Sequence, residues 1–332
     1  MKKEGVIEKV NEINDKLKTS LKTIDDKDQK RNMKKNAKSK QKKFLVFGII
    51  VNIGILWFLK YSYLFSYFLN SISLFKFHGI SLPSFKFLLP LGISYYTLQA
   101  ISYIVDVYRG QIKADKNFIK VALFLSFFPQ MVEGPIGRYN KLADQLYEPH
   151  SITEKNLKYG FELILWGYFK KMVIADRIAI YANEVFNNYA QYNGIVILIG
   201  IICYTIQIYA EFSGGIDIVR GVASLFGITL EENFRRPFYA KSIDEFWRRW
   251  NITLGSWLRD YIFYPVSLSK ATTKISLFSE KLFKKTYISK LIPVAFSLLF
   301  VWLGNRNLAW SWIKICCIWN VLLYYNDAWK IS

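Results

Sequence analysis

Histidine and cysteine are scarce in this sequence of 332 residues. The two histidines, His78 and His150, lie too far apart to show the spacing of metal ligands, which excludes a histidine-based metal site. The three cysteines, Cys203, Cys316 and Cys317, include no CxxC pair. The sequence therefore predicts neither a disulfide framework nor a zinc site, and no bound metal.

Acidic residues are also few, and much of the resulting basic excess lies near the N-terminus. Asp and Glu total 25 against 45 Lys and Arg, which gives a net charge of +20, although 52% of the residues are hydrophobic. A soluble chain this basic is normally polar on average, so residence in a membrane reconciles the two properties. The lysine-rich residues 1–43 contain no apolar segment of the kind found in a signal peptide.

The lysine run at residues 30–43 contains no aromatic side chains between its charges, and it leads directly into an apolar run at Phe44. This pattern disfavours nucleic-acid binding. A cytoplasmic segment, held inside by its positive charge and attracted to anionic membrane lipid, is the favoured interpretation.

Apolar runs of roughly the length needed to cross a bilayer recur after Phe44. They cover residues 44–65, 90–108, 159–182, 194–213 and 288–304. Residues 119–132 are too short for a span and predict a helix leading into a re-entrant turn. Residues 266–286 predict a lysine-rich polar loop.

The expected fold is therefore an all-α, polytopic integral membrane protein with broken and re-entrant helices. The simplest partition places a basic cytoplasmic segment at 1–43 and one membrane domain at 44–304. An atypical tail follows at 305–332. We expect the chain to be a multi-pass protein of the cell membrane.

The first motif is FFPQMVEGPIGRY at residues 127–139. Its two prolines and two glycines break the helix beside Gln130, Glu133 and Arg138. Polar side chains at membrane depth are costly and tend to mark functional sites. A turn lining a reaction channel, with Glu133 and Arg138 paired or holding a polar substrate, and an ordinary interfacial turn both remain open.

The second motif, YAEFSGGIDIVR at residues 209–220, places Glu211 and Asp217 around a predicted glycine break at the end of a membrane helix. Asp217 and Arg220 have the i,i+3 spacing that lets two side chains pair on one helix face. The spacing alone favours an ion pair at a helix terminus over a catalytic carboxylate.

The third motif runs from Lys241 to Pro265 and is dense in arginine and tryptophan. Ser242 and Glu245 predict a capping box that opens a helix. Its aromatic and apolar residues, at helical spacing, are Phe246, Trp247, Trp250, Leu254 and Trp257. The neighbouring arginines, Arg248 and Arg249, suit the phosphates of an acyl donor. They suit an interfacial amphipathic helix equally well.

Together these stretches resemble the alginate O-acetyltransferase and D-alanyl-transfer branch of the membrane-bound O-acyltransferases. The matching segments, in the family's order, are PLGISYYTLQAISYIVDVYRG (90–110), FFPQMVEGPIGRY (127–139), EFSGGIDIVRG (211–221), and ENFRRPF through RDYIFYP (232–265). The resemblance implies a multi-helix acyltransferase core. It also implies transfer of an acyl group, acetyl in preference to D-alanyl, from a cytoplasmic thioester to an exported polysaccharide or an extracytoplasmic partner protein.

The resemblance also implies roles for particular residues. The donor is an acyl-CoA or acyl-carrier thioester, which is a substrate, and no bound cofactor is expected. Asn251 stands where the bacterial branch usually has histidine and is the candidate for orienting a substrate carbonyl. The expected substrate-binding residues are Gln130, Glu133, Arg138, Glu211, Asp217, Trp247, Arg248, Arg249, Trp250, Arg259 and Asp260.

The chain departs from the family pattern after Gly304, where the family continues with a Trp-His-Gly motif whose histidine is the expected base for the acceptor hydroxyl. One adenine removed near the Gly304–Asn305 junction, with a suitable choice of codons, turns Gly-Asn-Arg-Asn-Leu-Ala-Trp into Gly-Thr-Gly-Ile-Trp-His-Gly. The motif histidine then falls at the position of Ala309. We therefore expect a frameshifted tail, missing spans at both ends, and little or no transferase activity.

Three alternatives remain open from the sequence. D-alanyl transfer to teichoic acid is the nearest, although Gln130 in the turn favours acetylation. Broken helices and buried polar residues also suit a transporter, but no inverted repeat is present. A non-catalytic membrane scaffold is compatible with the missing histidine.

Overall fold

The computed structural model describes residues 9, 12–17, 27–71, 92–131, 133–284 and 286–308. Within these ranges the chain is helical, and its one β-type pairing is an isolated antiparallel bridge between Phe234 and Trp250. The all-α prediction is thus confirmed for the part of the chain that is described. The chain divides into two compact units, Met1–Glu133 with Arg138–Pro149, and Gly134–Gly137 with His150–Ser332.

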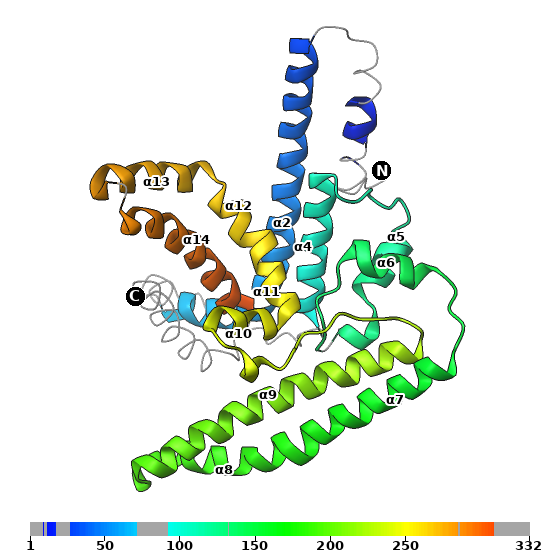
Figure 1. Ribbon diagram of the computed structural model, residues 1–332. Helices are drawn as coiled ribbons and strands as arrows, with labels where there is room; N and C mark the ends of the chain where they lie inside the picture. The colour runs from blue at the N-terminus through cyan, green and yellow to red at the C-terminus, as the bar shows by residue number, and fades with distance from the viewer. Residues whose placement is uncertain are drawn as a thin grey trace. The chain divides into compact units, whose positions relative to one another are not determined.

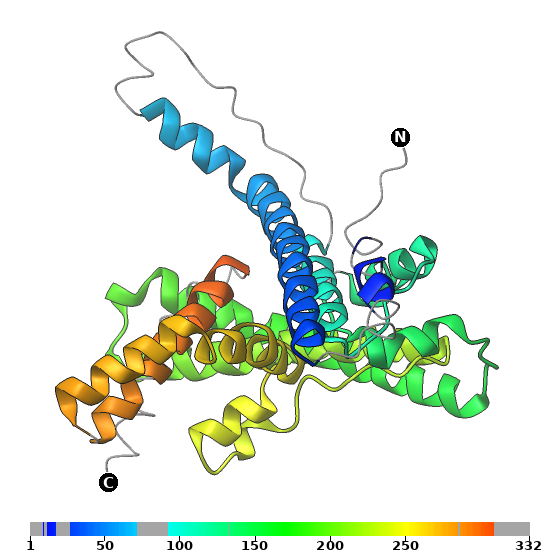
Figure 2. The same ribbon diagram turned by 90° about the horizontal axis from the view of Figure 1, so that it is seen from above.

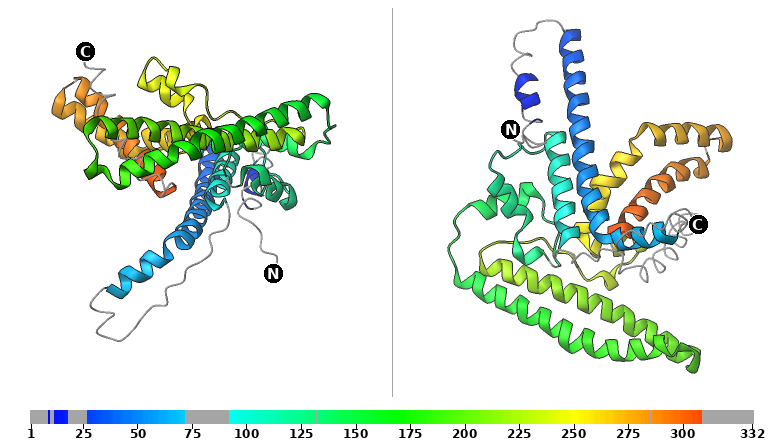
Figure 3. Two further views of the ribbon diagram at one scale, coloured as in Figure 1. Left: turned by 90° about the horizontal axis from the view of Figure 1, so that it is seen from below. Right: turned by 180° about the vertical axis from the view of Figure 1, so that it is seen from behind.

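In the first unit, the long helix α2 (Lys27–Ser71) packs along α4 (Ile93–Arg109), as Figure 3 shows. Three shorter elements follow: α5 (Phe118–Leu125), the single turn η1 (Phe128–Gln130) and α6 (Tyr139–Tyr147). Left-handed glycines bound α4. A Cβ atom on Gly92, which has φ 75°, would lie 1.9 Å from the carbonyl oxygen of Met131, so only glycine fits between α4 and the η1 turn.

The second unit is built on an antiparallel helix pair, drawn in green in Figure 1. One arm is continuous through α7 (Glu154–Tyr168), the π-helical segment η2 (Phe169–Ala175) and α8 (Asp176–Asn187). After the short turn η3 (Tyr189–Gln191), α9 (Gly194–Leu225) forms the other arm. Asn193 caps α9 by accepting a hydrogen bond from the Val196 amide at 3.1 Å.

The predicted glycine break at 214–215 is wrong, because α9 continues through it as a regular helix to Leu225. Gly214 and Gly221 of α9 instead allow close packing against α7. A Cβ on Gly214 would lie 2.8 Å from the Gly167 carbonyl oxygen, and one on Gly221 would lie 2.7 Å from that of Gly160. Small residues that let two backbones approach are characteristic of helix pairs in membranes.

Gly167→Ala is expected to destabilise the protein by about 1–3 kcal/mol, the usual cost of overpacking a tight interface. The new methyl group would meet the Gly214 carbonyl oxygen at 2.6 Å and the Ile218 amide at 2.9 Å, and backbone atoms cannot move aside cheaply. Gly194→Ala, with no atom within 4 Å, is the control and should change little. Thermal unfolding in detergent compares the two, and equal losses would contradict the packing argument.

The remainder of the second unit is a series of short helices and a closing hairpin. These are η4 (Pro237–Tyr239), α10 (Ile243–Arg249), α11 (Ile252–Leu258), the π-helical segment η5 (Arg259–Phe263), α12 (Tyr264–Ser267), α13 (Lys270–Phe283) and α14 (Tyr287–Leu308). The predicted polar loop at 266–286 is wrong, since α12 and α13 occupy most of it. Ser269 caps α13 by accepting from the Thr272 amide at 3.2 Å, and α13 packs against α14 (Figure 2).

Two helices in the described ranges are long and apolar enough to cross a bilayer, Lys35–Leu59 and Gly194–Leu225. A third apolar stretch, Tyr287–Leu303, is shorter. The two long candidates expose large apolar side chains. Those of α2 include Phe47, Ile50 and Phe58, and those of α9 include Leu198, Ile199 and Ile202. The partition at 43 and 304 stays a prediction, and α2 passes through residue 43 without interruption.

Candidate functional site

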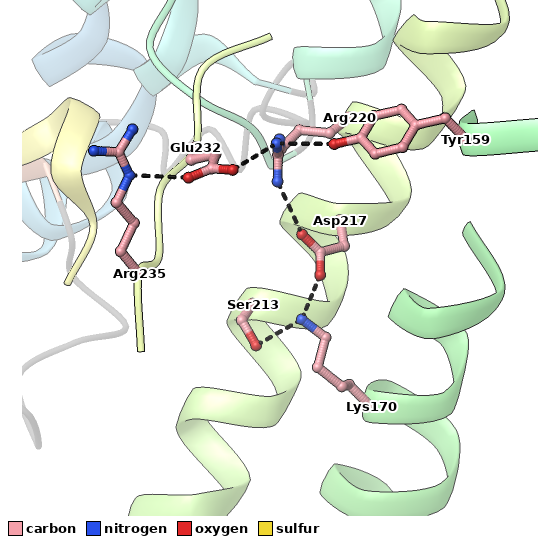
Figure 4. Close-up of polar contacts among 7 residues, drawn as sticks. All are labelled: Tyr159, Lys170, Ser213, Asp217, Arg220, Glu232 and Arg235. Carbon is pink, nitrogen blue, oxygen red and sulfur yellow. Dashed lines mark hydrogen bonds and ion pairs between the residues drawn. The ribbon is translucent and has the colours of Figure 1, made fainter. Parts of the chain in front are cut away.

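A buried ion-pair network crosses the α7–α9 pair, and Figure 4 shows it in full. The Lys170 ammonium, on the π-helical segment η2, lies 2.6 Å from Asp217 Oδ2 and donates to Ser213 Oγ at 3.1 Å. The Lys170 side chain is 9% exposed and the Asp217 side chain 17%. A buried charge is tolerated when it is paired and hydrogen-bonded, and Asp217 meets that condition through partners from two helices.

Arg220 extends the network toward the segment that follows α9. Its guanidinium lies 3.4 Å from Asp217 Oδ1, so the predicted i,i+3 pair is confirmed. The same group lies 3.3 Å from Glu232 Oε1 and 3.4 Å from the Tyr159 hydroxyl. Glu232 in turn pairs with Arg235 at 2.9 Å. Two cations, Lys170 and Arg220, therefore share the one carboxylate of Asp217, an arrangement that suits a fixed anion more than a proton-transfer group.

Glu211 is held by a second, more exposed pair. The Lys171 ammonium lies 2.7 Å from Glu211 Oε1 and 3.0 Å from Asp176 Oδ1. The side chains of adjacent residues on a regular α-helix point in directions about 100° apart, so both do not contact the same neighbouring helix. Lys170 and Lys171 both lie in the wider π-helical segment η2, and both pair with acidic residues of α9. π-Helical turns are frequent at functional sites.

A second polar centre, which the sequence did not indicate, forms around Asn233. Its side chain is 1% exposed. The backbone carbonyl oxygen of Asn233 accepts a hydrogen bond from the Ile252 amide at 3.0 Å, and its side-chain Oδ1 accepts one from the Thr253 amide at 3.1 Å. Arg235 N–H donates to the Arg249 carbonyl at 3.0 Å beside these bonds. Asn233 thus fixes the turn between α10 and α11.

Thr253 links this turn to the Gly-Pro-Ile segment of the first motif, because its Oγ1 accepts from the Ile136 amide at 3.0 Å. The first motif, the third motif and the ENFRRPF stretch therefore converge on the Asn233–Thr253 pair. No periodicity marks Asn233, and its position after Glu232 in the ENFRRPF stretch is its only sequence signal. The Nδ2 group of Asn233 is buried without a hydrogen-bond partner among the described residues.

Asn251, the candidate for orienting a substrate carbonyl, occupies a left-handed backbone conformation with φ 43° and ψ 56°. Asparagine adopts this region more readily than most residues. The conformation ends α10 at Arg249 and lets α11 begin at Ile252, so the predicted aromatic face spans two helices. Arg236, which precedes Pro237, is also left-handed with φ 47°. Strained backbone of this kind tends to occur at functional sites.

The arginines of the third motif are paired with carboxylates of their own helix. Arg248 lies 2.9 Å from Asp244, and Arg249 lies 2.5 Å from Glu245. The capping box is confirmed in part, because Ser242 Oγ accepts from the Glu245 amide, whereas the Glu245 carboxylate accepts from the Lys241 amide. The hydrogen bond from the Lys241 amide and the hydrogen bond from the Arg249 guanidinium both lower the pKa of the Glu245 carboxyl group. An anionic ligand would have to displace these carboxylates from the arginines.

Aromatic rings from α9, η4 and α10 pack together. Trp250 stacks on Phe246 with centroids 5.6 Å apart and lies edge-on to Phe234 at 5.1 Å. Tyr209 of α9 contacts Trp250 at 6.0 Å. Trp247 lies edge-on to Phe246 at 4.8 Å. Trp247 and Trp250 are thus tied to the aromatic cluster, and any substrate-binding role for them stays a prediction.

Arg259 and Asp260 lie side by side on the second π-helical segment, η5, with 3.4 Å between Arg259 Nε and Asp260 Oδ1. Next to them, Trp257 and Tyr261 pack with ring centroids 5.2 Å apart. Both π-helical segments of the described ranges therefore carry charged residues. Those of η2 pair with acidic residues of the second motif, and those of η5 belong to the third motif. The proposed roles of Arg259 and Asp260 in substrate binding remain predictions.

Gln130 lies in the first unit, in the η1 turn, and is 2% exposed. Neither its amide nitrogen nor its amide oxygen has a hydrogen-bond partner among the described residues. A buried amide without partners is costly, so Gln130 is the strongest candidate of its motif for meeting a ligand or an ordered water. The pairing of Glu133 with Arg138 stays a prediction. Ala309 lies outside the described residues.

No group of histidine, cysteine or acidic side chains within the described ranges could hold a metal ion. The polar centres of the second unit described above consist of ion pairs and amide hydrogen bonds. Their chemistry is that of fixed charges and oriented donors, which can bind and orient a polar substrate group.

Comparison with known proteins agrees with the motifs. The chain is 38% identical over 67% of its length to a probable alginate O-acetylase of Pseudomonas syringae pv. tomato, covering 42% of that protein. It is 33% identical over 67% of its length to a peptidoglycan O-acetyltransferase of Helicobacter pylori, covering 46%. A teichoic acid D-alanyltransferase of Bacillus subtilis is 30% identical over 52% of the chain, with 44% covered.

The chain thus spans a little under half the length of these relatives. Residues 110–280, about half of the chain, match the MBOAT family of membrane-bound O-acyltransferases. This range contains the Lys170–Asp217–Arg220 network, the Asn233–Thr253 pair and both π-helical segments. The resemblance predicted from the motifs is confirmed, and the chain belongs to the membrane-bound O-acyltransferase family.

Proposed function

We propose that this protein is built to transfer an acetyl group from a cytoplasmic thioester, an acyl-CoA or acyl-carrier thioester, to an exported cell-envelope polysaccharide. The observation that supports acetyl over D-alanyl is the order of similarity among the relatives. The alginate and peptidoglycan O-acetyltransferases share 38% and 33% identity, and each matches 67% of the chain. The D-alanyltransferase shares 30% over 52%.

The described helices suggest how the chain would support such a transfer. The Asn233–Thr253 pair holds Asn251 in its left-handed turn, from which its amide would orient the thioester carbonyl. The Lys170–Asp217–Arg220 network would hold α7 and α9 in register beside it. The buried Gln130 amide would bind a polar substrate group. We further propose that additional spans accompany the two candidate spans and that the basic N-terminal segment is cytoplasmic.

We also propose that the 332-residue chain does not turn over. Neither His78 nor His150 lies in a Trp-His-Gly motif. General-base catalysis by a positioned side chain contributes roughly 10²–10⁴-fold to a reaction rate. Without that base the acceptor hydroxyl stays protonated, although the groups that would hold the donor are retained.

The purified chain is therefore expected to bind a labelled acetyl thioester without forming acetylated polysaccharide. Equilibrium binding with acetyl-CoA and with an acetylated carrier protein measures the first part. Proteoliposomes loaded with the same donors, with polysaccharide outside, measure the second. A D-alanyl carrier thioester serves as the comparison donor. Robust acetyl transfer would overturn the inactivity proposal, tighter D-alanyl binding would favour teichoic acid as acceptor, and no donor binding would favour a scaffold or transporter.

A further inference from the structure

Helix α13 presents a row of lysines on one face. They are Lys270, Lys274 and Lys281; Lys284 directly follows the end of the helix, and all four are exposed. Spacings of four and seven residues place the first three along one side of an α-helix with 3.6 residues per turn. The only acidic residue of α13, Glu280, lies to one side of the row. The face therefore carries a concentrated positive charge.

None of these lysines forms an ion pair with a carboxylate within the described ranges. Helix α10 differs, because its Arg248 and Arg249 each pair with a carboxylate one turn earlier. The described part of its own unit thus leaves the positive charge of α13 without ion-pair partners, which is the electrostatic condition for binding an anionic surface.

The opposite face of α13 is fixed by packing in the hairpin with α14. Ser279, which is 1% exposed, donates its hydroxyl to the Ser289 carbonyl oxygen at 2.8 Å. Thr272 is also buried, and its hydroxyl donates to the Val266 carbonyl at 2.6 Å. These bonds set the rotation of α13 about its axis, so the direction of the lysine row is determined within the hairpin.

Between the lysine row and the buried face runs an apolar strip. Phe278 and Leu282, one turn apart, are 68% and 62% exposed. Leu277 is also exposed but lies among the lysines. The adjacent helix α14 likewise exposes Val294 and Leu299. Both helices of the hairpin therefore expose apolar side chains.

We propose that α13 is an interfacial helix of the bilayer, with its lysines on anionic phospholipid headgroups and Phe278 and Leu282 in the acyl-chain region. A basic face beside an apolar strip is the composition of helices that lie in the plane of a membrane interface. Lysine stems are long enough to keep their ammonium groups at the headgroups. The inference rests on the fold and on membrane residence, and it is independent of the proposed acyl transfer.

Two features favour a lipid surface over an acidic protein as the partner. Apolar side chains are exposed on both α13 and α14, and a bilayer would cover them. The chain also belongs to a membrane-bound family, so a bilayer is always adjacent. Lysines near an anionic membrane surface are attracted to it, and the attraction grows with the number of lysines.

The test measures the depth of nitroxide labels on the full chain in vesicles of phosphatidylcholine and phosphatidylglycerol. Single cysteines are placed at Lys274, Phe278, Lys281 and Leu282 in a background whose native cysteines are changed to serine. All four sites are exposed, so the labels leave the α13–α14 contact intact, and elution profiles confirm folding. Oxygen, which partitions into hydrocarbon, and a nickel chelate, which stays in water, report immersion.

Labels at Phe278 and Leu282 are expected to favour oxygen, and those at Lys274 and Lys281 to favour the nickel chelate. Immersion at Phe278 should also fall when phosphatidylglycerol is omitted, or when the four lysines are changed to glutamine. Equal chelate access at all four sites would overturn the proposal and indicate water or a protein partner. Equal oxygen access at all four would overturn it in favour of a membrane-buried hairpin.

Discussion

Asp217→Ala is expected to destabilise the folded protein by about 3–5 kcal/mol, the range measured when one partner of a buried ion pair is removed. The substitution leaves two cations, Lys170 and Arg220, without the carboxylate they share. Neither can turn readily to water, because their side chains are 9% and 14% exposed. Glu232 remains near Arg220, but it is half-exposed and also pairs with Arg235.

The shared carboxylate predicts an order among variants that a simple pair would not give. Lys170→Met should cost less than Asp217→Ala, because Asp217 keeps Arg220 as a partner. Asp244→Ala removes an ion pair whose side chains are 67% and 66% exposed, and it should change stability by at most about 1 kcal/mol. Denaturation of the purified protein in mixed micelles ranks the three. Equal losses for Asp217→Ala and Asp244→Ala would show that the network is not a buried one.

The sequence predicted those features that depend on neighbours along the chain. Four features follow from local spacing or turn chemistry. They are the helix that ends at Arg109-Gly110, the apolar helix that begins at Gly194, the i,i+3 pair of Asp217 with Arg220, and the Ser242 cap. Each is stabilised within a few residues, so composition and periodicity are sufficient to find it.

Features that depend on distant residues were missed or misread. Gly214 looked like a helix break, yet it permits contact with Gly167, which lies far away in sequence. Lys170 pairs with Asp217 across the same helix interface. It lies in a π-helical segment that no sequence pattern predicted. Asn233 acts through backbone amides of another motif. The lysine-rich stretch was predicted as a polar loop, but it contains α13, in which Ser279 and Thr272 pack inward.

Restoring the reading frame is expected to produce the largest functional change. We expect the gene, with one adenine removed near the Gly304–Asn305 junction, to encode a chain whose acetyl transfer exceeds that of the present chain by roughly 10²–10⁴-fold, the contribution of a positioned general base. The motif histidine would replace Ala309. The measurement is acetylated polysaccharide formed by proteoliposomes containing each chain at equal amounts.

Two controls separate the histidine from the rest of the altered tail. The corrected chain with alanine at the motif-histidine position should bind the labelled acetyl thioester as the corrected chain does but should lose the gain in transfer. Asn251→Ala in the corrected chain tests the other candidate group, the Asn251 amide. This substitution should weaken acetyl transfer although the general base is still present. Equal transfer by the corrected chain and its alanine variant would remove the histidine from the mechanism.

The DNA sequence around the Gly304 codon decides whether this experiment concerns the natural gene. A run of adenines one base shorter than the present sequence implies, followed by apolar codons in the shifted frame, would make the 332-residue chain a damaged or misread form of an acyltransferase. If the present frame is correct and no apolar segment follows in the shifted frame, the frameshift account fails. The fixed charges around Asp217 and the left-handed turn at Asn251 would then belong to a family member without the motif histidine. We would then expect these groups to bind the acyl donor, and equilibrium binding of the labelled acetyl thioester would test that role.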